Sequence, residues 1–406
     1  MNKRDVVIIG AGPAGMMAAI TASESGRRVM LVDRNPQIGR KLLSTGNGRC
    51  NLTNAELSID RFHGASPDFI AAVINQFDQN DTMDFFRSLG LLLKQEDNGR
   101  IFPRTNQASS VVEVLRQRLR ANRVEVALDT QVKSIDRDSN WRIDLIDGRS
   151  FEAIDLIVAT GGRAAHQLGS TGDGLFWARK LGHSLTPMFA ALVPIETAQS
   201  WPKEVAGVKI EARVQGLSKG QVIGESTGDL LFTTYGVSGT AAMALARPVA
   251  AALANDPVSL NIDMFSDMTT SQLDNLLSDV LTNAANISLC EAMIGMLPSP
   301  LIEIVCKSAG LDRAQKATQV TDKQCAKLAG VMKNLTLTVA KLRPYKEAQV
   351  TAGGVDCSEI NPQTMGSKLH DNLYFAGEIL DVDADSGGFN LQWAWSSGRV
   401  AGRLGE

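Results

Sequence analysis

The chain has 406 residues, of which 44% are hydrophobic and 21% are charged, and its formal net charge is −3. This length favours two or three domains over a single core, and the balanced charge argues against a polybasic surface for nucleic acid or an anionic membrane. No apolar run approaches the length of a membrane span, and the N-terminal apolar run is too short for a secretory signal. We therefore expect a cytoplasmic protein whose partners include neither nucleic acid nor a membrane.

Cysteine and histidine usage argues against a metal centre. The five cysteines lie far apart without a CxxC pair, and the four histidines show no metal-ligand spacing. We expect reduced thiols and no metal site. The sequence leaves the oligomeric state open.

The chain begins with a strand-turn-helix-strand unit that ends in an acid. Its parts in order are Val6–Ile9, Gly10–Gly15, Met16–Ser25, Val29–Val32 and Asp33. Gly10 permits the tight turn, Gly12 lets a pyrophosphate approach the backbone, and Gly15 lets the helix pack closely on the sheet. A carboxylate at the end of the second strand accepts hydrogen bonds from the adenosine ribose. The unit predicts dinucleotide binding.

The elements expected in the rest of the chain fall into two groups, which meet at residue 191. Up to residue 191 we expect a loop, helices and strands in the order Ile38–Asn54, Asn80–Ser88, Ser109–Ala121, Val124–Ala127, Thr130–Asp136, Trp141–Ile146, Asp155–Ala159 and Gly172–Leu181. Beyond it we expect strands, helices and a final strand-loop-helix in the order Val208–Val214, Gln221–Glu225, Asp229–Thr234, Thr240–Leu253, Thr269–Lys333, Leu335–Ala340, Glu347–Thr351, Leu373–Ala376, Gly377–Gly388 and Phe389–Leu404. This predicts a discontinuous nucleotide-binding domain, residues 1–191 and 346–406. Its insert, residues 192–345, is β-rich to about 265 and helical from about 266.

Two segments distinguish FAD from NAD. Val158–Gly162 and Phe375–Glu378 each read as a buried strand that runs into a glycine turn. Folds of the glutathione reductase type use both turns together with the N-terminal one to hold FAD. The helix that begins at Phe389 would then direct its positive end toward the flavin pyrimidine carbonyls.

Four longer motifs carry a family resemblance. GRKLLSTGNGRCNLTN (Gly39–Asn54), STGDG (Ser170–Gly174), AQVTAGGV (Ala348–Val355) and the segment Phe375–Gly398 together resemble the BaiN-like/YhiN-like flavoproteins. The resemblance implies an α/β fold: a Rossmann-like FAD-binding domain of the glutathione reductase type, interrupted by an insert with a small β-barrel and a helical part. Members have been assigned as dehydro-bile-acid reductases or aminoacetone oxidases.

The resemblance also implies a set of FAD-binding residues. Arg40 and Lys41 would neutralise diphosphate charge, and Val132 would meet the adenine through its main chain. The expected set is Gly10, Gly12, Pro13, Ala14, Gly15, Asp33, Arg34, Arg40, Lys41, Val132, Thr160, Gly161, Gly377, Glu378, Phe389, Asn390 and Leu391.

The catalytic residues stay unassigned. Relatives often have a His in the pattern LFTH-x-G-x-SGP, where this chain has Thr234, and Tyr235 beside it is an alternative acid. Cys50 lies near the expected flavin without a partner cysteine, so we expect it to pack in its loop. Asp381, Asp383 and Asp385 resemble a metal-binding run, but their setting favours turn formation and flavin-side hydrogen bonds.

These observations predict an FAD-dependent oxidoreductase that transfers hydride between flavin N5 and a small organic substrate. We expect NAD(P)H to supply reducing equivalents by transient binding, because no second GxGxxG occurs in the middle third. Two alternatives remain open: a flavin-binding redox sensor or interaction protein without turnover, and an amine oxidase that uses O2.

Overall fold

The computed structural model describes residues 2–405, and the chain divides into two compact units. The first unit runs to Phe189 and resumes at Gln349, and the second is Ala190–Ala348. The chain leaves the first unit within β11 (Phe189–Ala191) and re-enters it just before β18 (Val350–Ala352). Each unit has its own hydrophobic core.

The first unit is built on a mostly parallel sheet with the order β7-β2-β1-β10-β9-β8. Its strands are β1 (Asn2–Ile9), β2 (Val29–Val32), β7 (Glu125–Ala127), β8 (Val132–Arg137), β9 (Trp141–Leu145), β10 (Ser150–Val158) and β19 (Leu373–Phe375). The edge of β10 that faces away from β1 pairs with two strands. Ser150–Ala153 pair with antiparallel β9, and Leu156–Val158 pair with parallel β19. Because β1, β2, β10 and β19 are parallel, their carboxyl ends lie at one edge.

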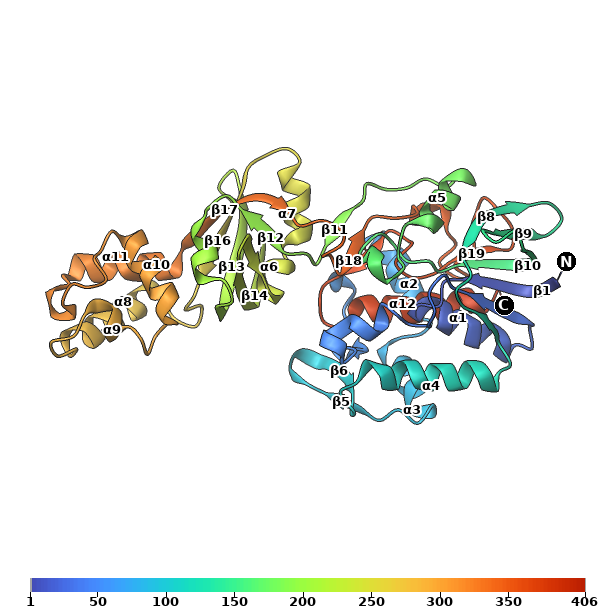
Figure 1. The fold of residues 1–406 in the computed structure, drawn as a ribbon, viewed down its shortest axis with the longest axis horizontal. Coiled ribbons are helices and arrows are strands. Elements are labelled where there is room, and N and C mark those ends of the chain that lie inside the picture. Colours follow the sequence, from blue (N-terminus) through green and yellow to red (C-terminus); the bar gives the residue numbers. More distant parts are fainter. Residues whose placement is uncertain (1, 406) are drawn as a thin grey trace. The chain divides into compact units, whose positions relative to one another are not determined.

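Two buried helices, α1 (Pro13–Glu24) and α12 (Phe389–Gly402), lie side by side (Figure 1). Glycines on α12 permit this approach, since a Cβ at Gly398 would overlap the carbonyl oxygen of Ala14. One turn later, a Cβ at Gly402 would lie 2.6 Å from the carbonyl oxygen of Ala18.

Smaller elements complete the first unit. Its other helices are α2 (Pro67–Ile74), α3 (Gln79–Ser88), α4 (Ala108–Ala121) and α5 (Asp173–Lys180). Its short strands form the sheets β3-β6-β5 and β20-β4, with bounds β3 (Thr53–Asn54), β4 (Phe62–Gly64), β5 (Leu93–Gln95), β6 (Arg100–Pro103) and β20 (Val382–Ala384). Its 3-10 turns are η1 (Leu42–Gly48), η2 (Ile59–Arg61), η3 (Asp97–Gly99), η4 (His166–Leu168) and η7 (Cys357–Glu359).

The second unit combines a closed barrel with a helical part. The barrel order is β12-β15-β14-β13-β16-β17, with bounds β12 (Ile195–Thr197), β13 (Lys209–Ser218), β14 (Gln221–Thr233), β15 (Gly236–Ser238), β16 (Val258–Asp263) and β17 (Leu335–Leu342). Its helices and turns are η5 (Trp201–Val205), α6 (Thr240–Met243), α7 (Ala246–Leu253), α8 (Thr270–Thr282), α9 (Leu289–Ala292), α10 (Ser299–Ala309), η6 (Ala317–Gln319) and α11 (Asp322–Lys333).

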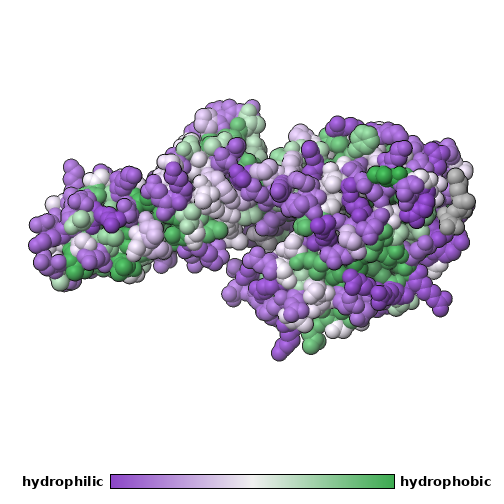
Figure 2. Space-filling view, viewed as in Figure 1, coloured by the Kyte–Doolittle hydropathy of each residue, from purple (hydrophilic) through white to green (hydrophobic). Residues whose placement is uncertain are grey.

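The helical part has little exposed apolar surface. Among its described residues the large hydrophobic side chains that are exposed are Leu276, Ile287 and Ile294. On the face drawn in Figure 2, apolar side chains of this part are interspersed with hydrophilic ones. Within residues 2–405, no helix is both long enough and apolar enough to cross a bilayer.

The expected fold class is confirmed, although several elements differ from their expected bounds. The helix expected over Thr240–Leu253 is split into α6 and α7, because Pro248 lacks an N–H and its ring would clash with the carbonyl of Ala244. The strands expected over 221–225 and 229–234 are one strand, β14, because antiparallel pairing with β13 continues through Gly228.

Candidate functional site

The carboxyl edge of the main sheet gathers the predicted turns. Gly10 follows β1, Asp33 follows β2, Thr160 follows β10, and Gly377 follows β19. These segments lie far apart in the sequence but at one end of adjacent strands, which is where open α/β sheets bind ligands.

The N-terminal glycine turn is tightly packed at Gly10 and Gly15 but has free space in front of Gly12. Gly10 has a φ of +108°, and a Cβ at Gly15 would overlap the carbonyl oxygen of Gly10. A Cβ at Gly12, in contrast, would meet no atom within 4 Å. Pro13 occupies the first helical position, where its missing N–H costs no hydrogen bond. The space in front of Gly12 and the N–H groups of α1 suit a diphosphate.

Asp33 is held by the turn and by Asn35. Its Oδ2 accepts a hydrogen bond from the Ala11 N–H at 2.6 Å. Its Oδ1 accepts from the backbone N–H and the side-chain Nδ2 of Asn35, at 2.8 and 2.9 Å. A carboxylate offers about four acceptor positions, so Oδ2 retains one for a ribose hydroxyl.

A cleft opens beside this turn. It is lined by Ile9, Gly10, Val32, Asp33, Arg34, Thr130, Gln131, Val132, Thr160, Gly169, Thr171, Asp173 and Trp177. Arg34 donates from Nη1 to Thr171 Oγ1 at 2.5 Å and to Asp173 Oδ2 at 2.9 Å. Five predicted residues therefore share one cleft: Gly10, Asp33, Arg34, Val132 and Thr160.

Sequence reasoning missed other residues that line or support the cleft. Thr130, Trp177 and Asp173 line it. Asn35 orients Asp33 by donating a hydrogen bond to its carboxylate. The STGDG motif that contains Asp173 carried a signal, but its partner could not be recognised from the sequence. That partner is Arg34, in a segment far earlier in the chain.

Arg40 and Lys41, the basic pair expected near the diphosphate, contact different acceptors. Lys41 Nζ lies 2.5 Å from Glu378 Oε2, so its charge faces that carboxylate. Glu378 Oε1 also accepts a hydrogen bond from the Thr351 N–H at 3.0 Å. Arg40 donates from Nη1 to Asn35 Oδ1 at 3.0 Å. The segment after β2 is thus tied to the turn that follows β19.

The segment before α12 is closed by its own side chains. Asn390 Oδ1 accepts from the Ala384 N–H, and its Nδ2 donates to the carbonyls of Ala384 and Asp385. Its side chain is therefore engaged, and only backbone N–H groups of the first turn can serve a ligand. Within residues 2–405, no side-chain hydrogen bond caps the helix at Gly388, which has a φ of +106°. Phe389 is buried and makes an edge-to-face contact with Phe62, and Leu391 is half-buried.

Comparison with known proteins identifies the family. The profile of the HI0933-like protein Rossmann domain matches residues 4–404. The chain belongs to the HI0933-like family. It is 36% identical to the 3-dehydro-bile acid delta(4,6)-reductase of Clostridium scindens, across 99% of this chain and 98% of that protein. It is 31% identical to the ribosomal RNA dihydrouridine synthase of Escherichia coli, across 98% and 96%.

Solved structures share the fold of this HI0933-like chain. The 3-ketosteroid delta1-dehydrogenase of Sterolibacterium denitrificans aligns with a TM-score of 0.53 and 13% identity, over 99% of both chains. At that identity the likeness concerns the fold. Taken with the family match and the full-length relatives, it identifies the protein as an FAD-dependent oxidoreductase.

The residues present fit the FAD of this family. The open side of Gly12 leaves room for the diphosphate, and the acceptor on Asp33 suits the ribose. Thr160 Oγ1 is buried without a hydrogen-bond partner among the described residues, although it belongs to a residue that lines the cleft. Each feature is one that a bound nucleotide would satisfy.

Cys50 does not have the setting of a redox cysteine. Its side chain is fully buried, and burial raises the pKa of its thiol to about 12 although a hydrogen bond with Thr45 opposes the rise. Reactive cysteines need a lowered pKa and some exposure. Cys50 instead adopts a φ of +61°, and its N–H donates to the carbonyl of Thr45 in η1.

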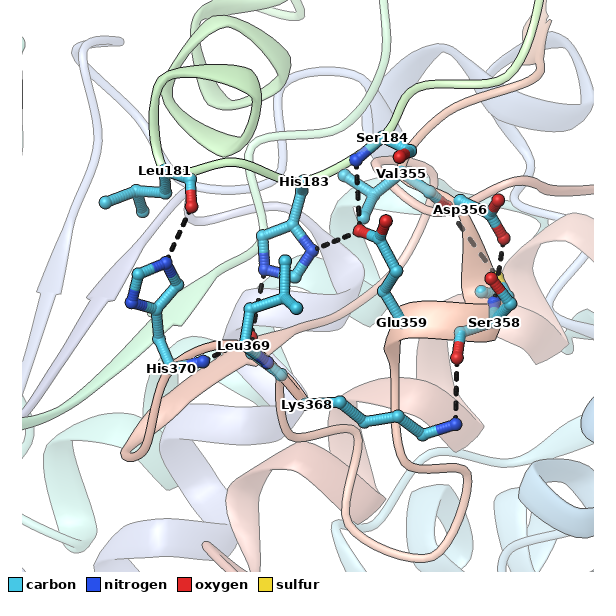
Figure 3. A network of polar contacts seen from close by, with 12 residues as sticks. Leu181, His183, Ser184, Val355, Asp356, Ser358, Glu359, Lys368, Leu369 and His370 are labelled. Atoms are coloured by element: carbon cyan, nitrogen blue, oxygen red, sulfur yellow. Dashed lines mark hydrogen bonds and ion pairs between the residues drawn. The ribbon is translucent and has the colours of Figure 1, made fainter.

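A second polar cluster centres on His183 (Figure 3), and His183, Glu359 and Ser367 are not among the residues that line the cleft. His183 Nδ1 is 2.9 Å from Glu359 Oε2, and Nε2 is 2.9 Å from Ser367 Oγ. The spacing resembles a Ser-His-acid triad. The imidazole is 0% exposed, however, and Ser367 Oγ already accepts the N–H groups of Leu369 and His370. We assign this cluster to structure: it ties the segment after α5 to η7 and to residues 366–370.

Proposed function

We propose that this protein reduces a carbon–carbon double bond conjugated to a carbonyl group. The match to the Clostridium scindens reductase over 99% of the chain carries this proposal. A 3-dehydro bile acid with delta(4,6) unsaturation presents double bonds conjugated to its 3-oxo group. Dihydrouridine arises when the uracil double bond next to a ring carbonyl is saturated. The activities for which the two relatives are named therefore share one chemistry.

In this proposal the carboxyl edge of the sheet holds FAD. The diphosphate would lie over Gly10, Gly12, Pro13, Ala14 and Gly15, and the adenosine would lie between Asp33, Arg34 and Val132, next to Thr160 and Gly161. Arg40, Lys41, Gly377 and Glu378 would surround the ribityl diphosphate, and backbone N–H groups of Phe389, Asn390 and Leu391 would face the pyrimidine carbonyls. Reduced FAD supplies a hydride equivalent to the substrate.

NAD(P)H is the proposed source of reducing equivalents. The cleft beside Gly10 is the dinucleotide cleft that FAD would fill, so the nicotinamide cofactor would bind transiently elsewhere. Anaerobic stopped-flow mixing with NADH and with NADPH tests this step. Bleaching of the visible flavin absorbance at a rate that supports turnover is expected with at least one of them.

We propose a small molecule, and not RNA, as the substrate. Residues 190–348 carry 14 Lys and Arg against 15 Asp and Glu, so the insert has no excess of positive charge. The relatives from Escherichia coli and Haemophilus influenzae act on ribosomal RNA according to their names. The test therefore needs both kinds of acceptor.

The deciding experiment follows flavin reoxidation after anaerobic reduction. The reduced protein is mixed with a steroid dienone, a simple cyclic enone, a uridine-containing ribosomal RNA fragment, or O2. Rapid reoxidation by the enones with formation of saturated product supports the proposal, and reoxidation by RNA alone shifts the substrate to nucleic acid. Reoxidation by O2 alone, with amine turnover, supports the oxidase. Reduction without any turnover supports a redox sensor and contradicts the proposal.

A further inference from the structure

A histidine and a carboxylate meet beside the start of α12. Strands β4 and β20 pair antiparallel, which brings His63 opposite Asp383. Asp385, one residue beyond β20, then reaches His63: its Oδ1 lies 2.9 Å from His63 Nε2. Arg61 donates from Nη1 to Asp385 Oδ2 at 3.2 Å. The dyad lies entirely within the first unit.

The fold fixes this dyad at the uncapped end of the helix. Asn390, in the first turn of α12, donates from Nδ2 to the carbonyl of Asp385 at 3.2 Å. On the other side, the Asp385 N–H donates to the carbonyl of Arg61 at 2.9 Å. Phe62, the neighbour of His63, packs on Phe389 with ring centroids 6.0 Å apart. His63 is therefore anchored to the helix end that we propose for the flavin.

The electrostatics favour an ionised partner for the imidazole. Burial alone would raise the pKa of Asp385, but hydrogen bonds from His63 and Arg61 outweigh it and lower the pKa below its usual value. An ionised carboxylate accepts the Nε2–H of His63 and so fixes the ring and its tautomer. Nδ1 has no hydrogen bond among the described residues, and the side chain is 32% exposed. One nitrogen is held while the other is available.

We propose that His63 is the proton donor of the reduction and that Asp385 is its positioning residue. This inference rests on the proposed enone chemistry. The substrate is reduced by two electrons at the expense of reduced FAD: hydride adds to the β-carbon, and the π pair of the double bond forms a new bond to the proton of His63 Nδ1 at the α-carbon. His63 is left neutral and regains a proton from solvent, to which it is partly open.

The test separates the two half-reactions in the FAD-loaded protein. His63→Gln is expected to slow enone-dependent reoxidation by about 100-fold or more, with unchanged flavin reduction by NAD(P)H and unchanged KM. Asp385→Asn is expected to slow the same step. His166→Gln, at an exposed histidine of the same unit, is the matched control and is expected to retain the wild-type rate. FAD content and thermal melts verify that each variant folds.

Two further readouts do not reduce to lost activity. Added imidazole is expected to restore reoxidation in His63→Ala, because the site is partly open. In 15N NMR of the imidazole, neutral His63 is expected to be the Nε2–H tautomer, and Asp385→Asn is expected to weaken that preference, because a neutral amide oxygen is a weaker acceptor than a carboxylate.

The outcomes distinguish the inference from the function on which it rests. A wild-type protein that reduces no enone refutes the proposed function and the inference with it. A wild-type protein that reduces enones while His63→Gln keeps the full rate refutes only the inference. Loss of rate in His63→Gln, together with failure of imidazole to rescue a folded, FAD-loaded His63→Ala, also counts against proton donation and indicates a structural role.

Discussion

At the scale of single residues, the cleft depends on side chains that hold other side chains. Asp33 accepts three N–H groups, one from the turn and two from Asn35. Asn35 in turn donates to the carbonyl of Leu168 and accepts from Arg40. A single substitution at Asp33 therefore affects both the ligand and the turn that carries it.

Asp33→Ala is expected to weaken FAD binding by about 1.5–3 kcal/mol, because hydrogen bonds to a charged group are lost. Asp33→Asn is expected to weaken it as well, since one amide oxygen cannot accept from both Ala11 and Asn35. Fluorescence titration of the FAD-free protein measures the affinity. Asp138→Ala, at a carboxylate that is 83% exposed, serves as control. Equal affinities for Asp33→Ala and the control would contradict the expected role.

His183 predicts a dependence of stability on pH. Burial lowers its pKa below the ordinary value of 6.5, although the hydrogen bond with Glu359 opposes the shift. The unfolded chain therefore takes up a proton at higher pH than the folded one, and stability falls as the pH drops below about 6.5. Urea unfolding at several pH values is expected to show this slope, and His183→Gln is expected to reduce it.

Glu359 adds a second, more acidic pH range over which the stability changes. Burial alone would raise its pKa, but hydrogen bonds from Ser184 and His183 lower it below the ordinary 4.5. Its contribution is present above that value and is lost as the pH falls further. A slope that is unchanged in His183→Gln between neutral pH and pH 5 would exclude His183 as its source.

At the scale of elements, the packing of α1 on α12 rests on the absence of side chains. Gly398→Ala is expected to destabilise the first unit by about 1–3 kcal/mol, because the new methyl group overlaps the carbonyl of Ala14. Gly330→Ala in α11 is the matched control: a Cβ there meets nothing within 4 Å, so the change is expected to stabilise the helix by up to about 1 kcal/mol. Denaturant unfolding measures both, and a change of the same sign in both would contradict the packing argument.

Sequence reasoning succeeds where chemistry is local. The turn from Gly10 to Gly15, the acid after β2 and the glycine turns after β10 and β19 each follow a short apolar strand, and each is found at the same sheet edge. It fails where the partner is distant or the strand is short. His63 and Asp385 meet through β4 and β20, strands of three residues each without a recognisable pattern. The Arg34–Asp173 ion pair could not be predicted for the same reason, since only the tertiary fold brings its two segments together.

At the scale of the whole molecule, two separate cores predict two unfolding transitions. FAD is expected to raise the transition of the first unit and to leave that of the second unchanged, because a ligand stabilises the unit that binds it. Leu156→Ala in the first core and Leu260→Ala in the second, both at fully buried positions, are each expected to lower the free energy of unfolding of their own unit by about 2–5 kcal/mol. Calorimetry distinguishes them, and a single transition that responds equally to both substitutions would contradict independent units.

The shared edge of β10 has a consequence for how the protein is made. Leu156–Val158 pair with β19, which the ribosome supplies only after residues 159–372 have been synthesised. At typical rates of synthesis this edge waits for roughly 10 to 40 seconds. An open strand edge invites pairing with other chains. We infer that the nascent first unit is at its most vulnerable to aggregation in this interval. A chain truncated before Leu373 would lack β19 and would keep this edge open permanently.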